Sequence, residues 1–326
     1  EEILQPILRF RSYYFLTLVG FVVVILLLIR RVAGQVARSV NQLSVAAGDI
    51  ARGEFDLALP ERTGDEIGAL THSFNTMAAQ LKERSQLRQS LDLAKEVQQN
   101  LLPDKSPEFP GMDVAGRSVY CDQTGGDYFD YLDTGQSFQF VVGDVAGHGI
   151  SAALLMSSVR ASLRQCYDSG DDIGAVISDV NRHITRDVGN SGQFMTLFYL
   201  AIDSDRKTIQ WVRAGHDSGM LYRRAGDIVE ALDGAGMALG VDPEWSYSVQ
   251  KAEGLQAGDI VLLGTDGIWE AFNGDGVMFG KEAVKKIIRE QRDQPAGVIL
   301  DSVFDAVASH VGDTKIAVDM TLIVVR

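Results

Sequence analysis

The first third of the chain carries its hydrophobic residues in one long run. From Ser12 to Ile29, 18 consecutive residues contain no charge, and Arg11 and the pair Arg30-Arg31 border them. A run of this length reaches the threshold for crossing a lipid bilayer, and arginines at its ends suit the water interface. We therefore predict a transmembrane helix over residues 12–29, with residues 1–11 as the end of a truncated upstream region.

A buried core helix and a signal peptide are the alternatives for this run. No small-residue cleavage site follows it, and the flanking sequence continues as a charged, amphipathic helix, which disfavours a signal peptide. Arg30, Arg31 and Arg38 slightly outnumber the arginines on the other side. By the positive-inside rule, the chain after residue 30 is expected in the cytoplasm, anchored in the inner (cytoplasmic) membrane.

Two helical patterns follow the apolar run. The first ends at Gly53, and an extended stretch of residues 55–60 separates it from a second that opens at Asp65-Glu66. In the second pattern the apolar residues step by 3, 4, 3 and 4, which is the a/d seam of a coiled coil and predicts a homodimer. The seam residues are Ile67, Leu70, Phe74, Met77 and Leu81.

The seam continues over residues 84–102 after a step of six residues from Leu81 to Leu87. Such a step shifts the heptad phase and locally rewinds a coiled coil. We expect a coiled-coil signalling linker here, through which a rotation or register shift of the preceding helices is transmitted to the residues that follow. A passive dimeric stalk fits the same pattern.

Beyond residue 102 the pattern changes to short apolar strands that border aspartate and glycine. Four such segments occur in order, and a long helical run follows the second of them; the segments are residues 125–130, 138–149, 260–267 and 318–325. Asp-Gly alone is an ordinary turn. Several carboxylates gathered at strand ends, however, would supply the oxygen ligands that magnesium and manganese take.

Charge divides the chain at the same place. Of the 326 residues, 30 are Lys or Arg and 44 are Asp or Glu, a formal net charge of −14. Residues 1–102 carry 11 of each sign, so the whole acidic excess lies in residues 103–326. Such a chain repels nucleic acid, and no nucleic-acid partner is expected. The two cysteines form no CxxC pair, which excludes a disulfide scaffold or a zinc ribbon.

The helical front resembles a HAMP domain. The stretch DEIGALTHSFNTM, residues 65–77, is similar to the second helix of that family, and GDIARGEFDLALP, residues 48–60, is similar to its first-helix end and connector. Asn41 stands where the family usually has proline. The resemblance implies a HAMP domain over residues 30–83.

The acidic back, from about residue 94, resembles the type 2C (PPM) metal-dependent serine/threonine phosphatases of the SpoIIE/RsbU-like branch. The stretches that carry the resemblance are LAKEVQQNLLP (93–103), GGDYFD (125–130), VVGDVAGHGISAALLM (141–156), FMTLFYLAID (194–203), RAGH (213–216) and TDGIWEA (265–271). The resemblance implies an α+β domain over residues 103–326. Its fold would be an αββα sandwich, two antiparallel sheets flanked by helices, with two Mn²⁺ or Mg²⁺ ions at one end.

Carried over residue by residue, the resemblance makes Asp144 a bridge between both ions, with the Val145 carbonyl as a further ligand. Asp266 would hold one ion and Asp127 would support the second. Two such ions clamp a phosphoryl group and activate a bridging water, so the reaction needs no protein nucleophile. We therefore assign no catalytic role to the cysteines, the serines or His148.

One departure bears on this centre. The family's last motif reads Asp-Asp-Ile/Met-Thr, with its first aspartate a metal ligand, whereas this chain has Val318 at that position, followed by Asp319. One ion is therefore expected to bind more weakly, since Asp319 would replace the ligand only if the strand slipped by one residue, which reverses its faces. A lesser departure is the stretch 215–218, Gly-His-Asp-Ser, where the branch tends to have Gly-His-Asn-Pro.

The resemblance implies a membrane-tethered, signal-regulated phosphatase that hydrolyses phosphoserine or phosphothreonine on a regulatory protein, an anti-sigma-factor antagonist. Because of Val318, the alternative is a low-activity variant or a pseudophosphatase that acts as a signalling scaffold. A diguanylate cyclase is disfavoured, because Gly125-Gly126-Asp127-Tyr128-Phe129 lacks the glutamate of GGDEF. A histidine kinase is disfavoured because neither a phosphoacceptor helix nor a glycine-rich nucleotide lid follows the HAMP-like helix.

Overall fold

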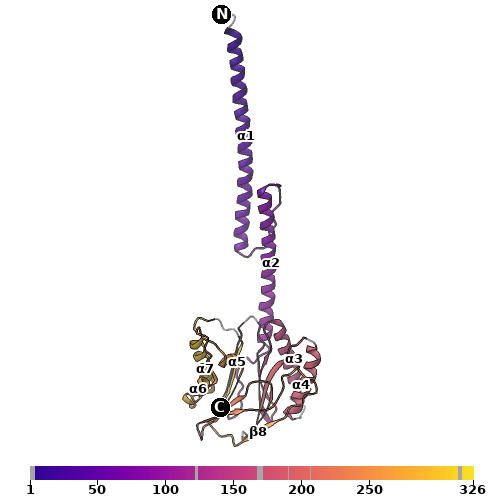
Figure 1. Cartoon of the computed structure of the whole chain (residues 1–326), viewed down its shortest axis with the longest axis vertical. Helices are drawn as coiled ribbons and strands as arrows, with labels where there is room; N and C mark the ends of the chain where they lie inside the picture. Colours follow the sequence, from indigo (N-terminus) through magenta and orange to yellow (C-terminus); the bar gives the residue numbers. More distant parts are fainter. Residues whose placement is uncertain (1–3, 122–123, 167–171, 190, 206, 315–317) are drawn as a thin grey trace. The chain divides into compact units, whose positions relative to one another are not determined.

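The computed structural model describes residues 4–121, 124–166, 172–189, 191–205, 207–314 and 318–326. The chain divides into two compact units, residues 1–90 and residues 91–326. Figure 1 labels the helices of both units.

The first unit begins with one long helix, α1 (Leu4–Ala51). Its side chains from residue 13 to residue 32 are exposed and mostly apolar. By length and composition it can cross a bilayer, and it is the one such helix in the described part of the chain. Helix α1 is therefore a candidate for a membrane span, in line with the uncharged run.

A second helix, α2 (Glu66–Gln99), follows an extended connector. The Asp65 carboxylate accepts two backbone N–H groups of its first turn, at 3.1 and 3.2 Å, and so caps the helix. Asn75 exchanges two hydrogen bonds with the backbone of Leu59, which fixes the connector against the helix. The C-terminal end of this continuous helix belongs to the second unit.

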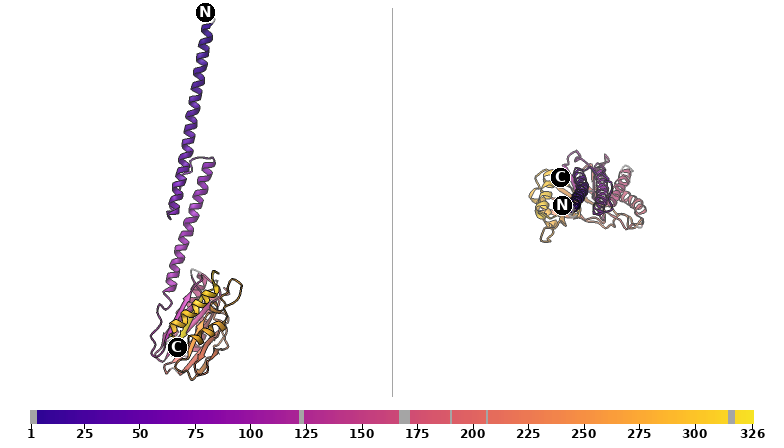
Figure 2. Two further views of the ribbon diagram at one scale, coloured as in Figure 1. Left: turned by 90° about the vertical axis from the view of Figure 1, so that its left-hand side faces the viewer. Right: turned by 90° about the horizontal axis from the view of Figure 1, so that it is seen from above.

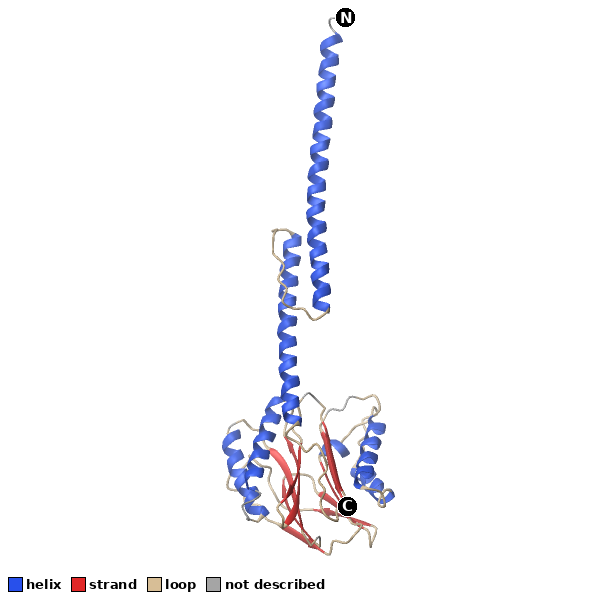
Figure 3. Cartoon of the chain, turned by 180° about the vertical axis from the view of Figure 1, so that it is seen from behind, coloured by secondary structure: helices blue, strands red, loops and turns tan. Residues whose placement is uncertain are grey.

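The second unit contains two five-stranded antiparallel sheets, drawn in red in Figure 3. One sheet has the order β1-β10-β9-β6-β7 and the other the order β2-β3-β4-β5-β8. The strands are β1 (Val114–Val119), β2 (Tyr128–Asp133), β3 (Ser137–Val145), β4 (Met195–Asp203), β5 (Thr208–Ala214), β6 (Gly219–Arg223), β7 (Ile228–Leu232), β8 (Gln250–Glu253), β9 (Ile260–Gly264) and β10 (Met320–Val325).

Helices cover the outer face of each sheet, as Figure 2 shows for the yellow helices that lie across the strands. One apolar cluster joins the β2 sheet to α3 (Ile150–Cys166) and α4 (Ile173–Val188). A second joins the β1 sheet to α5 (Asp266–Trp269), α6 (Lys281–Glu290) and α7 (Ala296–Val311), and a third fills the space between the sheets. The layers confirm the predicted αββα sandwich.

Strand β10 shows how alternation assigns side chains to these layers. Ile323 and Val325 belong to the cluster between the sheets, whereas Leu322 and Val324 belong to the cluster under the helices. Because strand side chains alternate with a period of two, the odd-numbered positions of β10 face the opposite sheet. The same alternation indicates on which face of the sheet the residues just before β10 place their side chains.

Candidate metal centre

The predicted ligands come together at one end of the sandwich. In the β2 sheet, the start of β2 pairs with the end of β3, Tyr128 opposite Gly143. In the β1 sheet, the start of β10 pairs with the end of β9, Leu322 opposite Gly264. Antiparallel pairing therefore brings the aspartates that border these four strands to a common end.

Asp127 is the most deeply buried of these aspartates and is 1% exposed. Its Oδ2 accepts hydrogen bonds from the hydroxyls of Thr265, at 2.8 Å, and Thr321, at 2.6 Å. The two threonines also pair with each other through their backbones, since the Thr265 N–H donates to the Thr321 carbonyl at 3.0 Å. Asp127, just before β2 of one sheet, is thus held by Thr321 of β10 and by Thr265, which directly follows β9, of the other.

Asp144 and Asp266 are the partly exposed carboxylates at this end of the sandwich. Asp144 lies near the end of β3 and is partly exposed, and Asp266 begins α5. The Oδ1 of Asp266 is buried and has no hydrogen-bond partner among the described residues. An unpaired buried oxygen of this kind is costly, and a bound cation would relieve that cost.

The pKa values of these aspartates also indicate that their negative charges lack compensation. Burial, and then the charge of Asp144, raises the pKa of Asp127 well above its usual range. Burial, together with the charges of Asp266 and Asp319, raises the pKa of Asp144 to about 7. Burial and the charge of Asp217 raise the pKa of Asp266. Each shift disfavours the carboxylate form, which a divalent cation would favour.

Asp319 reaches the site without any slip of the strand. It is 6% exposed, and its two oxygens accept the backbone N–H groups of Cys121 and Gly126, each at 2.8 Å. Its odd number places it on the inner side of β10, next to Thr321, whereas Val318 is 47% exposed. Whether Asp319 replaces the missing ligand stays a prediction, because its oxygens are occupied by these backbone N–H groups. Its carboxylate anchors the loop that carries Asp127.

Val145 is buried at the end of β3, and its carbonyl oxygen faces the same loop. A Cβ on Gly126 would lie 3.0 Å from that oxygen, so the close approach of the two segments favours glycine. His148 is exposed in the turn before α3. The structure thus places Asp127, Asp144, Val145 and Asp319 around one loop.

His216 is a buried residue of this region that the sequence reasoning passed over. Its Nε2 lies 3.1 Å from the Gly264 carbonyl and its Nδ1 lies 2.8 Å from the Thr196 hydroxyl, so the ring joins β9 of one sheet to β4 of the other. Burial lowers its pKa to about 4. The carbonyl accepts, so Nε2 carries the proton of the neutral ring. Its place in RAGH, one of the quoted stretches, was the available signal.

Gln98 is a second residue that was missed. It lies at the end of α2, is 3% exposed, and forms two hydrogen bonds with Gly125, donating to its carbonyl at 2.6 Å and accepting its N–H at 3.2 Å. Gly125 lies two residues before Asp127. The end of α2 is thereby attached to the loop that carries a predicted ligand, and the stretch LAKEVQQNLLP contained the signal.

The donor set fits a hard divalent cation in part. All the groups are oxygens, and the unpaired Oδ1 of Asp266 has room for a ligand bond, while the partly exposed Asp144 shares a hydrogen bond with Asp127. Asp127 and Asp319 already accept hydrogen bonds. Within the described ranges, no three His, Cys, Asp or Glu side chains converge closely enough to form a ready-made metal site. The fit rests on Asp144 and Asp266.

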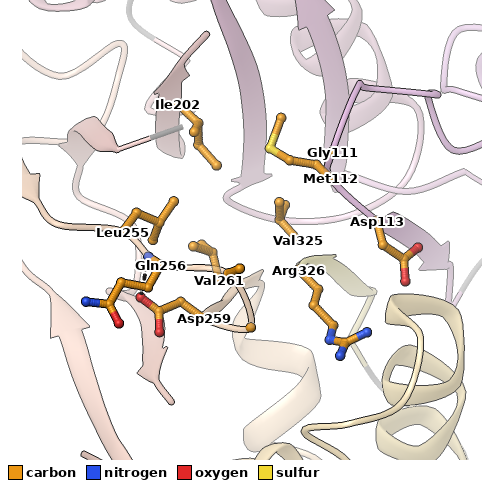
Figure 4. Close-up of a pocket in the computed structure, with 12 residues that line it drawn as sticks. Gly111, Met112, Asp113, Ile202, Leu255, Gln256, Asp259, Val261, Val325 and Arg326 are labelled. Atoms are coloured by element: carbon orange, nitrogen blue, oxygen red, sulfur yellow. Dashed lines mark hydrogen bonds between the residues drawn. The ribbon is translucent and has the colours of Figure 1, made fainter. Parts of the chain in front are cut away.

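A cavity of about 650 Å³ lies at the opposite end of the sandwich (Figure 4). Apolar side chains from the strand ends line much of it, among them Ile202, Val261 and Val325. Its two carboxylates are already paired, because Asp113 accepts the Ala296 N–H and Asp259 accepts the N–H groups of Arg224 and Gln256. The carboxylates of this cavity are therefore paired, whereas the buried Nε of Arg326, which also lines it, has no hydrogen-bond partner among the described residues.

Comparison with known proteins agrees with this architecture. The family model for stage II sporulation protein E (SpoIIE) matches residues 134–326, and the HAMP domain model matches residues 31–83. The phosphoserine phosphatase RsbU of Bacillus subtilis (strain 168) is 28% identical over 243 residues, which cover 74% of this chain and 71% of RsbU.

Two further similarities extend the comparison. The phosphoserine phosphatase RsbP of the same organism is 24% identical over 189 residues, 56% of this chain and 46% of RsbP, so the match spans less than half of that relative. Among solved structures, the SiaA-PP2C domain of Pseudomonas aeruginosa superposes with a TM-score of 0.65 at 23% identity. That match covers 75% of this chain and 98% of the SiaA domain, and it supports the fold.

Proposed function

Because the chain belongs to the SpoIIE family of PP2C-type serine/threonine protein phosphatases, we propose that it removes phosphate from phosphoserine or phosphothreonine on a regulatory protein. The observation that carries this proposal is the pair Asp144 and Asp266, two carboxylates at one end of the sandwich with raised pKa values. The names of the relatives favour a phosphoserine protein. The sequence resemblance adds an anti-sigma-factor antagonist as its class.

Asp144, the Val145 carbonyl and Asp266 would hold Mn²⁺ or Mg²⁺, and Asp127 would support a second ion. Such ions, when bound, stabilise phosphoryl charge and lower the pKa of a water that attacks phosphorus. The side chains of the protein hold and orient the groups that would bind the ions. The hydroxyls of Thr265 and Thr321 orient Asp127, and no side-chain nucleophile is required.

Asp319 has a different part in this proposal. Its oxygens fix the backbone at Cys121 and Gly126, so it orients the loop that carries Asp127 and is a weaker candidate for direct metal binding. Val318 supplies no oxygen at the position where the family has a ligand. We therefore expect one of the two ions to bind less tightly than the other.

We further propose that the enzyme is anchored in the cytoplasmic membrane and regulated through α2. The apolar α1 supports the anchor, and the HAMP match supports transmission and dimerisation. Leu70, Met77 and Leu87 are 51%, 46% and 60% exposed, so a second copy packed along α2 would cover them. A rotation of α2 would act on the loop at Gly125 through Gln98.

The test is hydrolysis by the full-length protein in detergent, with Mn²⁺ or Mg²⁺, on an aryl phosphate and on a phosphoserine protein. The proposal expects release of phosphate that a chelator stops and that Asp144→Asn abolishes. Absence of turnover in the wild type and in Val318→Asp, which restores the family's carboxylate, would contradict the enzymatic function.

A second candidate function is a pseudophosphatase that binds its partner and signals through conformation. It is favoured by the exposed Val318, by the involvement of Asp319 in backbone hydrogen bonds, and by the incomplete convergence of ligands. It predicts partner binding that a chelator leaves unchanged. Counting the bound metal by mass spectrometry or anomalous scattering, with and without Val318→Asp, separates the two functions.

A further inference from the structure

Lys281 begins α6, and its backbone is tied to the helix that starts with Asp266. The N–H of Gly280 donates to the carbonyl of Trp269 at 2.8 Å, and the N–H of Phe279 donates to the carbonyl of Ala271 at 2.9 Å. These bonds close the loop between α5 and α6. Lys281 is therefore held near the Asp266 side of the candidate metal centre by the main chain.

The side chain of Lys281 is held by two partners. Its Nζ lies 3.1 Å from Asp217 Oδ2 and 4.7 Å from the centre of the Trp269 ring. The indole N–H of Trp269 donates to the same Oδ2 at 2.6 Å. Trp269 is 4% exposed, whereas the Lys281 side chain keeps 38% of its surface exposed. The ammonium group is thus fixed on one side and open on the other.

Asp217 is one of the two residues, with Ser218, at which the chain departs from the Gly-His-Asn-Pro pattern of its branch. The Asp217 carboxylate adds a further negative charge beside Asp266 and contributes to the raised pKa there, an effect that Lys281 opposes. A phosphoryl group carries negative charge and would meet repulsion from these aspartates. An ammonium group has three N–H donors, and the contacts with Asp217 and Trp269 leave donor capacity for a further acceptor.

Resting on the proposed phosphatase function, we propose that Lys281, oriented by Asp217 and Trp269, binds a phosphoryl oxygen of the substrate beside the candidate metal centre. Lys281 then serves substrate binding more than the chemical step. The charge that Asp217 adds to this site is balanced by the same lysine. The ligand class is a phosphomonoester dianion.

The test uses the full-length protein in detergent with Mg²⁺ or Mn²⁺ and compares Lys281→Met with the wild type. We expect KM for an aryl phosphate and for a phosphoserine protein to rise about tenfold or more, with kcat changed much less, since one charge-assisted hydrogen bond is lost. Lys281→Arg should restore part of the loss. Lys285→Met, one turn along the same helix, is the matched control and should leave KM unchanged.

The double variant Asp217→Asn/Lys281→Met separates binding from simple charge balance. If Lys281 binds the phosphoryl group, the double variant keeps the raised KM. If Lys281 only neutralises Asp217, removal of both charges returns KM to the wild-type value, and the inference is overturned.

Calorimetric titration with inorganic phosphate in the presence of Mg²⁺ gives a readout that does not depend on turnover. We expect Lys281→Met to weaken phosphate binding about tenfold while Lys285→Met does not. Equal affinity in the wild type and Lys281→Met, or no phosphate binding by the wild type, overturns the inference. Phosphate binding through Lys281 without any turnover would contradict the phosphatase function and leave the inference standing.

Discussion

Two buried aspartates in the same short segment have opposite surroundings. Asp130, inside β2, is fully buried, and both of its oxygens lie 2.7 Å from guanidinium nitrogens of Arg164. The hydroxyl of Tyr128 donates to it as well, at 2.9 Å. Asp127, three residues earlier, receives two threonine hydroxyls and faces the charge of Asp144 without a cation as a hydrogen-bond partner.

The different surroundings indicate different roles for the two carboxylates. A buried ion pair with good geometry is complete within the fold, so Asp130 and Arg164 connect β2 to α3. Buried carboxylates that repel one another reduce the stability of the empty site, and they are expected where the missing charge is supplied from outside. The comparison predicts that mutations at the two places act in opposite ways on stability and activity.

Asp144→Asn should have the largest effect. We expect hydrolysis to fall about a thousandfold, because metal binding supplies several kcal/mol of stabilisation to the transition state and each 1.36 kcal/mol is a factor of ten. The unfolding temperature should stay constant or rise in the absence of metal, since the substitution removes one repelling charge. Initial rates and thermal unfolding of the same preparation check both, and a fall in stability with activity retained would reverse the comparison.

His216 should lower the stability of the fold in mild acid, against Asp127 and Asp144, whose raised pKa values make their protonation act in the opposite direction. The folded pKa of His216 is about 4, below the ordinary value of 6.5, so its contribution is complete above pH 6.5 and is lost as pH falls toward 4. The loss should amount to about 3 kcal/mol at 1.36 kcal/mol per unit. Denaturant unfolding followed by tryptophan fluorescence measures it, because all three tryptophans lie in the second unit.

His216→Gln, which keeps a donor for the Gly264 carbonyl, should remove the His216 contribution, so that the wild type loses about 3 kcal/mol relative to this variant as pH falls from 6.5 toward 4. The exposed His183 provides the matched control, and His183→Gln should leave the profile as in the wild type. Equal profiles in all three proteins would show that another group carries the acid sensitivity.

Divalent cations should stabilise the second unit of the wild type. At a concentration one hundred times the dissociation constant, the gain is about 2.7 kcal/mol. It should disappear in Asp144→Asn, persist in Asp130→Asn, and appear at lower metal concentration in Val318→Asp. Unfolding curves across a Mg²⁺ or Mn²⁺ titration test this, and a gain that survives Asp144→Asn would place the cation elsewhere.

Asp130→Asn should have the smallest effect, a loss of about 2 kcal/mol in the free energy of unfolding. Removing one member of a buried ion pair costs about 3–5 kcal/mol, and the value here is lower because the Arg164 side chain is 41% exposed. Hydrolysis by the folded protein should stay near the wild-type rate. Denaturant unfolding beside an activity assay gives both numbers, and a stability equal to that of the wild type would remove the contrast with Asp144.

Local patterns in the sequence were sufficient for several of these features. The uncharged run predicted the apolar α1, the 3-4 spacing predicted α2, and the quoted stretches predicted the sandwich and the aspartates at its strand ends. Dimerisation along α2 and the metal-binding roles of Asp127, Asp144, Val145, Asp266 and Asp319 stay predictions.

The face occupied by Asp319 could not be predicted from its neighbours alone. It depends on the register of β10 against β1 and β9, and that register places Asp319 inward beside Thr321 and leaves Val318 exposed. The family position of Val318 predicted a missing ligand oxygen, and that stays a prediction. The family position gave no indication that the next carboxylate would hold the loop of Asp127 through backbone N–H groups.

The sequence by itself determined the apolar helix, the helix with 3-4 spacing and the aspartates that border the strand ends, because periodicity and motif spacing are properties of neighbouring residues. Only the tertiary structure decided which charges are compensated. Arg164 reaches Asp130 across 34 positions, Thr321 reaches Asp127 across 194, and Lys281 of α6 meets Asp217 in the loop between β5 and β6. Charge compensation depends on distance in space, and that distance is set by how the two sheets and their helices pack.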